Sequence, residues 1–224
     1  MNAAIVPIKA LSSGKSRLHE ALGRADAEAL CLAMMQDVVA ALIATPSIDR
    51  VVVATPDADA AAAARALGAE AFDGPDPGLN PAIEQAATRL ADEGADLVMA
   101  VLGDVAAAEP EDFERLVLET RAAGAPAVGL APAADGGTAA LARMPAAAIP
   151  ARFGEQSGER HRAAAREAGV ALVELDLESL RLDLDRPEDV AAFLARPRGG
   201  PRTRACLEAM APGGGPGPDD RSTT

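Results

Sequence analysis

Short apolar runs alternate with helical segments along most of this chain, and this alternation limits the fold more than any other feature. The runs at 3–8, 51–54 and 97–102 have the length of strands, and each is followed by a turn and then by a segment with helical periodicity. Continuous apolar strands that alternate with helices indicate a mostly parallel sheet with helices on both faces. We therefore expect a single α/β domain.

The other predicted elements follow the same order. Apolar residues that recur every four positions predict a long helix from a cap at Asp26 to about residue 44. Further helices are predicted at 59–67, 80–93, 110–123, 158–168 and 186–195, strands at 69–72, 127–130, 139–143 and 171–175, and an extended segment at 181–184. From Arg196 the chain is rich in Pro, Gly and charge, which predicts a domain of 1–195 and a disordered tail of 196–224, where 204–210 could form one helical turn.

Composition narrows the class of partner. A net charge of −13 repels a polyphosphate backbone, and 2% aromatic residues, with no Trp or Tyr, leave few platforms for base stacking. Nucleic acid is therefore an unsuitable partner. The sequence has no basic segment leading an apolar one and no apolar span long enough for a bilayer, so we expect a cytoplasmic protein without membrane contacts.

The segment after the first apolar run is cationic in this acidic chain. Lys9 begins a Ser/Gly turn, and Lys15 and Arg17 follow where a helix is predicted to start. Backbone N–H groups, a helix start and Lys or Arg side chains together favour a phosphate site. Gly14-Lys15-Ser16 matches the second half of a Walker loop, but Lys9 stands where its first glycine would be. The alternative is a solvated basic turn.

Three aspartates are candidates for holding a divalent cation. Asp104 follows the most apolar strand, while Asp183 and Asp185 are two residues apart on an extended segment and so leave it on the same face. Convergence of the three would form an oxygen-rich site suited to Mg²⁺. The alternatives are that Asp104 caps the next element and that Asp185 caps the helix after it, with Glu188 three residues on.

Two glycine-rich segments could present backbone N–H groups to an anion. Asp135-Gly136-Gly137-Thr138 suits a phosphate or carboxylate, and it equally suits a hairpin turn. Residues 154–158 precede a helix in the same way. Ser157 and His161 have the spacing of a nucleophile and its base, but no buried acid is evident to orient the histidine, so we predict no hydrolytic triad. We expect His161 and His19 on helix surfaces.

Ligands of parallel α/β sheets bind beyond the carboxyl ends of the strands. That rule places 9–17, 55–57 and 103–104 on one rim, with Asn80 close to it.

The ordered set of these motifs resembles the phosphoenolpyruvate and 2-phospho-L-lactate guanylyltransferases of deazaflavin coenzyme F-420 biosynthesis. The resemblance runs from Ile5 to about Phe193. Its motifs are Val6-Pro7-Ile8-Lys9 with Gly14-Lys15-Ser16-Arg17-Leu18, Gly103-Asp104, Asp135-Gly136-Gly137-Thr138, Phe153-Gly154 with Ser157 and His161, and Leu182-Asp183-Leu184-Asp185 with Pro187-Glu188-Asp189. It implies a Rossmann-like nucleotidyltransferase (GT-A-like) fold.

The resemblance also implies roles. Catalysis would involve Lys15, Arg17 and Asp104, and Mg²⁺ would be held by Asp104, Asp183 and Asp185. The acid substrate would contact Thr138, Gly154 and Ser157, and the nucleotide would contact Lys9, Lys15, Arg17 and Asn80. The expected substrates are GTP and a small phosphorylated carboxylic acid: phosphoenolpyruvate, 2-phospho-L-lactate or 3-phospho-D-glycerate. Two alternatives stay open: a nucleotidyltransferase for a sugar phosphate or molybdopterin-type acceptor, and a nucleotide-binding module without transfer activity.

Overall fold

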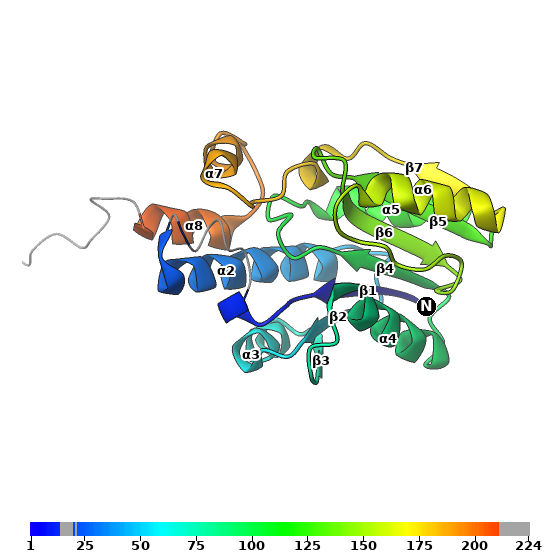
Figure 1. The fold of residues 1–224 in the computed structure, drawn as a ribbon, viewed down its shortest axis with the longest axis horizontal. Coiled ribbons are helices and arrows are strands. Elements are labelled where there is room, and N and C mark those ends of the chain that lie inside the picture. The colour runs from blue at the N-terminus through cyan, green and yellow to red at the C-terminus, as the bar shows by residue number, and fades with distance from the viewer. Residues whose placement is uncertain (14–19, 21, 211–224) are drawn as a thin grey trace, which may run out of the picture.

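The apolar runs of the sequence form one sheet of seven strands in the part of the chain that the structure describes, residues 1–13, 20 and 22–210 of a computed structural model (Figure 1). Its order is β3-β2-β1-β4-β6-β5-β7. The strands are β1 (Asn2–Pro7), β2 (Arg50–Thr55), β3 (Glu70–Asp73), β4 (Leu97–Val101), β5 (Ala127–Pro132), β6 (Thr138–Met144) and β7 (Ala171–Glu174). β1, β2 and β4 at its centre are almost wholly buried, as their continuous apolar sequences require.

One strand runs against the others. β6 is antiparallel to both of its neighbours, β4 and β5, whereas every other neighbouring pair is parallel. Val101 near the end of β4 therefore pairs with Ala140 near the start of β6. The beginning of β6 thus lies at the same edge of the sheet as the carboxyl ends of the parallel strands.

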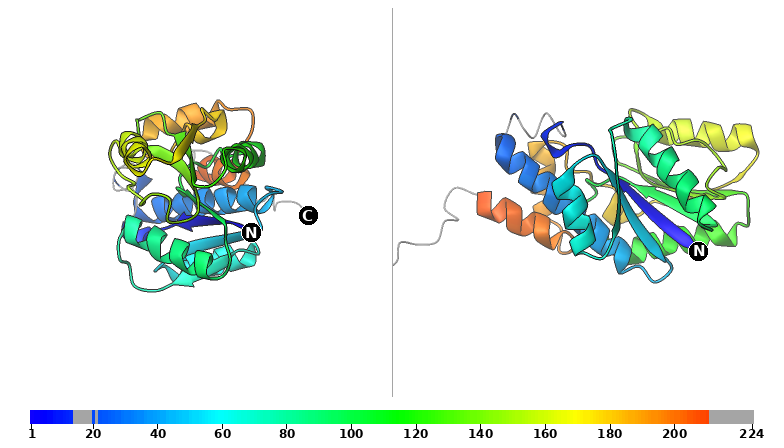
Figure 2. Two further views of the ribbon diagram at one scale, coloured as in Figure 1. Left: turned by 90° about the vertical axis from the view of Figure 1, so that its right-hand side faces the viewer. Right: turned by 90° about the horizontal axis from the view of Figure 1, so that it is seen from below.

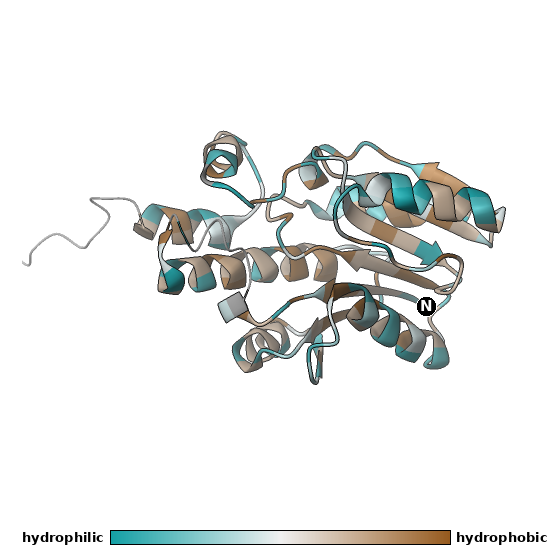
Figure 3. Ribbon diagram, in the orientation of Figure 1, coloured by the Kyte–Doolittle hydropathy of each residue, from teal (hydrophilic) through white to brown (hydrophobic). Residues whose placement is uncertain are grey.

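Helices cover both faces of the sheet (Figure 2). One face packs against α2 (Arg24–Ile43), α3 (Ala58–Ala66) and α5 (Pro110–Ala122), and the other packs against α4 (Leu79–Asp92) and α6 (Ser157–Ala168). Apolar colour is concentrated on the sheet and on the inner sides of the helices (Figure 3). Among the described residues, no helix has the length and apolar character needed to span a bilayer.

The fold class and most elements predicted from the sequence are confirmed, but one local prediction is wrong. The N-cap of α2 is Gly23 rather than Asp26, which lies in the first turn. Residues 181–184 pair with no strand; they follow a 3₁₀ turn, η2 (Glu178–Leu180), and lead into α7 (Pro187–Leu194).

The predicted disordered tail begins too early. Residues 201–210 form the helix α8 (Pro201–Met210), which packs against α2 and buries Thr203 and Leu207. The buried carboxylate of Asp37 on α2 accepts from the N–H groups of Arg202 (3.1 Å) and Thr203 (2.8 Å) and from the Thr203 hydroxyl (2.8 Å). This carboxylate caps the start of α8, so the domain extends at least to Met210. Residues 211–224 lie outside the described residues.

Candidate active site

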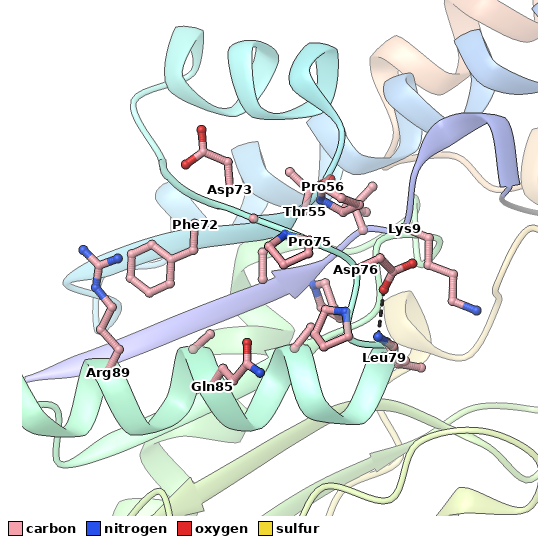
Figure 4. A pocket seen from close by; sticks show the side chains of 18 residues that line it. Lys9, Thr55, Pro56, Phe72, Asp73, Pro75, Asp76, Leu79, Gln85 and Arg89 are labelled. Carbon is pink, nitrogen blue, oxygen red and sulfur yellow. Dashed lines mark hydrogen bonds between the residues drawn. The ribbon is translucent and has the colours of Figure 1, made fainter.

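A cavity of about 300 Å³ opens at the carboxyl ends of the first three strands (Figure 4). Its walls come from the ends of β1, β2 and β3, the connection 74–78 and the first three turns of α4. Lys9 and Thr55, which the sequence placed on one rim, both line it. Its volume is at the lower end of the range of small-molecule sites, and its position agrees with the rule for open α/β sheets.

One wall of the cavity is a feature that the sequence did not assign to the site. The Pro/Gly segment 73–78 crosses from β3 to α4, and the Asp76 carboxylate accepts from the Gly78 N–H (2.8 Å) to hold its last turn. At the far end of the cavity, the Arg89 guanidinium lies 3.9 Å from the centre of the Phe72 ring. The signal in the sequence was two prolines and two glycines in a segment that cannot continue a strand or a helix.

The cationic loop is fixed to this rim at its first turn. Lys9 is exposed at the cavity, and the loop continues into a 3₁₀ turn, η1 (Leu11–Ser13). One oxygen of Asp57 accepts from the Leu11 N–H (3.0 Å), while the other caps α3 by accepting from Asp59 and Ala60. Lys15, Arg17 and His19 lie outside the described residues, so their predicted roles stay predictions.

Asp104 lies beside the end of β1. A Cβ on Gly103 would overlap Cδ1 of Ile8, so any larger residue there would require the end of the Ile8 side chain to move. The Leu184 N–H donates to the carbonyl oxygen of Asp104 (3.2 Å). Because Leu184 stands between Asp183 and Asp185, one backbone hydrogen bond brings the three predicted metal ligands into the same neighbourhood.

The donor set of this neighbourhood suits a hard cation, although it is not an all-protein cage. Carboxylate oxygens are ligands that Mg²⁺ prefers, and Mg²⁺ usually takes only one or two of them and completes its shell with substrate phosphates and water. Among the described residues, no three His, Cys, Asp or Glu side chains are placed to hold a metal ion by themselves. The predicted Mg²⁺ site therefore stays a prediction, and a metal there would need further ligands such as substrate phosphates and water.

The alternative role of Asp185 as a helix cap is wrong. The N-cap of α7 is Arg186, and the residue three positions later is Asp189. The Asp189 carboxylate accepts from the N–H groups of Asp185 (3.0 Å) and Arg186 (2.7 Å). Capping this helix therefore does not require the side chain of Asp185.

Residues 133–137 form the hairpin turn between β5 and β6, as one of the two interpretations of 135–138 predicted. The Gly137 N–H donates to the Asp135 carboxylate (2.7 Å), so the turn uses this donor itself. The same turn joins two other segments of the predicted site: its Gly136 carbonyl accepts from Gly158 (3.2 Å), and its Ala134 N–H donates to Arg181 (3.0 Å). It thereby brings Thr138 close to the start of α6 and to the segment of Asp183.

The start of α6 carries the other predicted contacts of the acid substrate. Gly154 has a φ of +121°, a conformation that other residues rarely adopt, and its carbonyl accepts from the Ser157 N–H (3.0 Å). Gln156, the N-cap, is left-handed with a φ of 51°, which is uncommon for a residue other than glycine. Ser157 is buried in the first turn, where helix N–H groups favour an anion.

His161 is buried, which contradicts the prediction that it lies on a helix surface. Its Nδ1 lies 2.9 Å from the Thr138 hydroxyl, and its Nε2 accepts from the Arg152 N–H (2.9 Å). Both ring nitrogens are thus occupied by partners other than Ser157, which supports the exclusion of a serine–histidine pair. Burial, together with the cations Arg143, Arg160 and Arg152, lowers the pKa of His161 to about 4.

We expect this histidine to make the protein sensitive to mild acid. Its pKa is about 4 when folded against 6.5 ordinarily, so between these values the unfolded chain binds a proton that the folded chain does not. The free energy of unfolding should therefore fall as the pH falls, by about 2 kcal/mol between pH 7 and pH 5. Urea unfolding at the two pH values measures it, and a His161→Gln variant should lose most of the difference. An equal fall in the variant would assign the acid sensitivity to other groups.

Asn80 lies in the first turn of α4, and both ends of its side-chain amide are engaged. It donates to the Phe153 carbonyl (3.1 Å) and accepts from the Phe153 N–H (2.7 Å). This pair of bonds holds the residue before Gly154. The predicted contact of Asn80 with the nucleotide stays a prediction, and its role in positioning the loop was not evident from the sequence.

Comparison with known proteins places this chain in a family. The model of the family described as guanylyl transferase CofC like matches residues 2–207. The chain belongs to this family. Among CofC-like relatives, a phosphoenolpyruvate guanylyltransferase from Streptosporangium roseum is 39% identical over 218 residues, which cover 96% of this chain and 93% of the relative. The family resemblance inferred from the motifs is confirmed.

Solved structures extend the likeness of this CofC-like chain at the level of fold. A crystal structure from Desulfovibrio desulfuricans G20, assigned to the nucleotide-diphospho-sugar transferases, has a TM-score of 0.75 at 18% identity and covers 93% of this chain and 96% of that one. Glucosyl-3-phosphoglycerate synthase from Mycobacterium tuberculosis, solved with Mn²⁺ and uridine diphosphate, has a TM-score of 0.55 at 13% identity and covers 94% and 78%. The predicted nucleotidyltransferase fold is confirmed.

Proposed function

We propose that this protein transfers the guanylyl group of GTP to the phosphate of phosphoenolpyruvate, releasing pyrophosphate, as a step in coenzyme F-420 biosynthesis. The proposal is supported by the match to the CofC-like family, together with a cavity of about 300 Å³ at the carboxyl ends of the first three strands and the start of α6 near the same edge of the sheet. Phosphoenolpyruvate is chosen over 2-phospho-L-lactate and 3-phospho-D-glycerate because the Streptosporangium relative is named as a phosphoenolpyruvate guanylyltransferase.

The two substrates occupy different parts of that edge in this proposal. The cavity beside Lys9 receives the nucleoside of GTP, and the cationic loop with Lys15 and Arg17 neutralises the triphosphate. Thr138, Gly154 and Ser157 bind the acid. A phosphate monoester is largely dianionic at neutral pH, so its oxygen needs little help from a general base. This agrees with His161, whose two nitrogens are already engaged within the protein.

The reaction is an in-line displacement at phosphorus. An oxygen of the acid's phosphate forms a bond to the α-phosphorus of GTP, the bond from that phosphorus to the oxygen bridging the β-phosphorus breaks, and pyrophosphate leaves with the electron pair. Asp104, Asp183 and Asp185 would hold Mg²⁺, which supplies Lewis-acid stabilisation of the charge on the phosphates when bound. A divalent metal is supported by the Mn²⁺ in the mycobacterial synthase and by the backbone hydrogen bond that brings the segment of Asp183 and Asp185 next to Asp104. The protein's task is to align two anions and to neutralise them.

The test is acid-dependent release of pyrophosphate. The protein is incubated with GTP and Mg²⁺ and with each of the three acids in turn, with ATP as the control nucleotide. A downstream transferase with its deazaflavin acceptor traps the unstable product. We expect release that requires both GTP and phosphoenolpyruvate. Release that requires one of the other two acids would identify that acid as the substrate in place of phosphoenolpyruvate. If a folded protein releases no pyrophosphate with any of the three acids, the proposed function is overturned.

A further inference from the structure

His161 connects three segments that the proposed function uses, and none of these bonds is to solvent. The ring lies in α6, its Nδ1 faces the Thr138 hydroxyl at the start of β6, and its Nε2 faces the backbone of Arg152. The side chain is fully buried, and the Phe153 ring meets the imidazole edge-on at 5.2 Å between centres. A histidine held at this many points has one orientation.

The partners of the ring determine where its proton lies. The Arg152 N–H can only donate, so Nε2 must carry a lone pair, and the single proton of the neutral ring is on Nδ1. Nδ1–H therefore donates to the Thr138 oxygen. A second proton on Nε2 would point at the Arg152 N–H, and the nearby guanidinium groups of Arg143, Arg160 and Arg152 also oppose a charged ring.

This tautomer has a consequence for Thr138. A hydroxyl that accepts a hydrogen bond from the histidine keeps its own hydrogen for another acceptor. Thr138 is therefore set as a donor, which suits a carboxylate or a phosphate and not a second donor. Thr138 is itself buried, so an anion reaches it only where the surrounding turn admits one; the hydroxyl is already oriented, which reduces the binding free energy lost in ordering it.

The other nitrogen of the ring fixes the loop before Gly154. Three consecutive backbone N–H groups of this loop donate to three different side chains: Ala151 to Glu84 (2.5 Å), Arg152 to His161 (2.9 Å) and Phe153 to Asn80 (2.7 Å). The His161 bond is the one that ties this loop to α6, and through Nδ1 to Thr138. One side chain thus sets the distance between the Thr138 hydroxyl and the backbone that leads to Gly154.

We propose that His161 is a positioning residue for the acid substrate, which orients the Thr138 hydroxyl as an anion donor and holds the backbone before Gly154 in register with it. This inference rests on the proposed function, because Thr138 and Gly154 are its contacts for the acid. It adds to that function a residue that need not touch either substrate.

Two substitutions separate the two bonds. In His161→Asn, the amide can replace Nδ1–H as the donor to Thr138 but does not reach Arg152. In His161→Gln, the longer side chain can replace Nε2 as the acceptor from Arg152 and leaves Thr138 without its donor. We expect each variant to raise the KM for phosphoenolpyruvate about tenfold, because each removes one of the two bonds that position the contacts of the acid, and to leave the KM for GTP within about twofold.

A double-mutant cycle distinguishes positioning from general support of the fold. Thr138→Val removes the hydroxyl and keeps the shape of the side chain. If His161 acts through that hydroxyl, His161→Gln should raise the KM for the acid far less in a Thr138→Val background than in the natural chain. Additive effects, or an equal rise in both KM values, would overturn the inference.

A spectroscopic measurement covers the case in which the His161 variants do not fold. The chain has two histidines, so a His19→Gln variant leaves His161 as the single imidazole signal. Nitrogen NMR should show the Nδ1–H tautomer at pH 7, and added phosphoenolpyruvate should shift that nitrogen. An Nε2–H tautomer or an unshifted signal would overturn the inference. If the unmodified protein binds neither substrate and transfers nothing, the proposed function is overturned instead. If the unmodified protein is active but the His161 variants change both KM values equally, only the role of His161 is overturned.

Discussion

Replacing Asp183 by asparagine should lower turnover by roughly a thousandfold and leave the fold intact. Asp183 is partly buried next to Leu184, whose N–H is bonded to the carbonyl of Asp104. Asparagine has the same shape and lacks the negative charge, so we expect the backbone to stay while the divalent cation loses a ligand. The measurements are pyrophosphate release under saturating substrates and thermal unfolding of the same preparation.

A matched control is available seven residues earlier. Asp176 is exposed, and its carboxylate forms an ion pair with Arg181 at the surface (3.2 Å). Asp176→Asn makes the same chemical change in the same segment, away from Asp104, and should leave turnover within about twofold because exposed pairs contribute little. If Asp183→Asn turns over as fast as Asp176→Asn, Asp183 does not belong to the metal site.

The largest effect on stability is expected at Glu84. Its carboxylate accepts from Arg143 Nη1 (2.8 Å) and from the Ala151 N–H (2.5 Å). The Arg143 side chain is completely buried; burial lowers the pKa of the guanidinium, and Glu84 partly offsets this. Glu84→Ala would leave a buried charge without its carboxylate partner, which should reduce the free energy of unfolding by about 3 kcal/mol in urea titrations.

Two further variants make this prediction specific. Glu84→Gln keeps a carbonyl oxygen for Arg143 and Ala151 and loses only the charge, so we expect it to lose about half as much stability. Glu159→Ala removes an exposed acid that pairs with Arg162 on α6, and it should change stability by less than about 0.5 kcal/mol. If Glu84→Ala is as stable as Glu159→Ala, the buried charge of Arg143 must be compensated by groups other than Glu84.

The sequence was informative where a pattern is local. Continuous apolar runs predicted the strands, and Asp104 became a candidate site residue because a carboxylate directly after such a run needs a ligand or water. The environment of His161 was not predictable, since its burial arises where α6, β6 and the loop before Gly154 meet. The full length of α8 was not predictable either: the sequence suggested only one helical turn at 204–210, and Asp37 on a predicted helix gave no sign that it would cap a segment 165 positions later in the chain.

The reversed strand β6 divides the candidate site by its order in the chain. Everything that lines the cavity comes from residues before 90, and the hairpin turn, Thr138 and the start of α6 come from residues after 132. Under the proposed function, recognition of the nucleotide and recognition of the acid are therefore encoded in separate stretches of the gene. Substitutions in the second stretch can change the acid without altering the nucleotide pocket, so members of one family can diversify in substrate while they keep a common nucleotide donor.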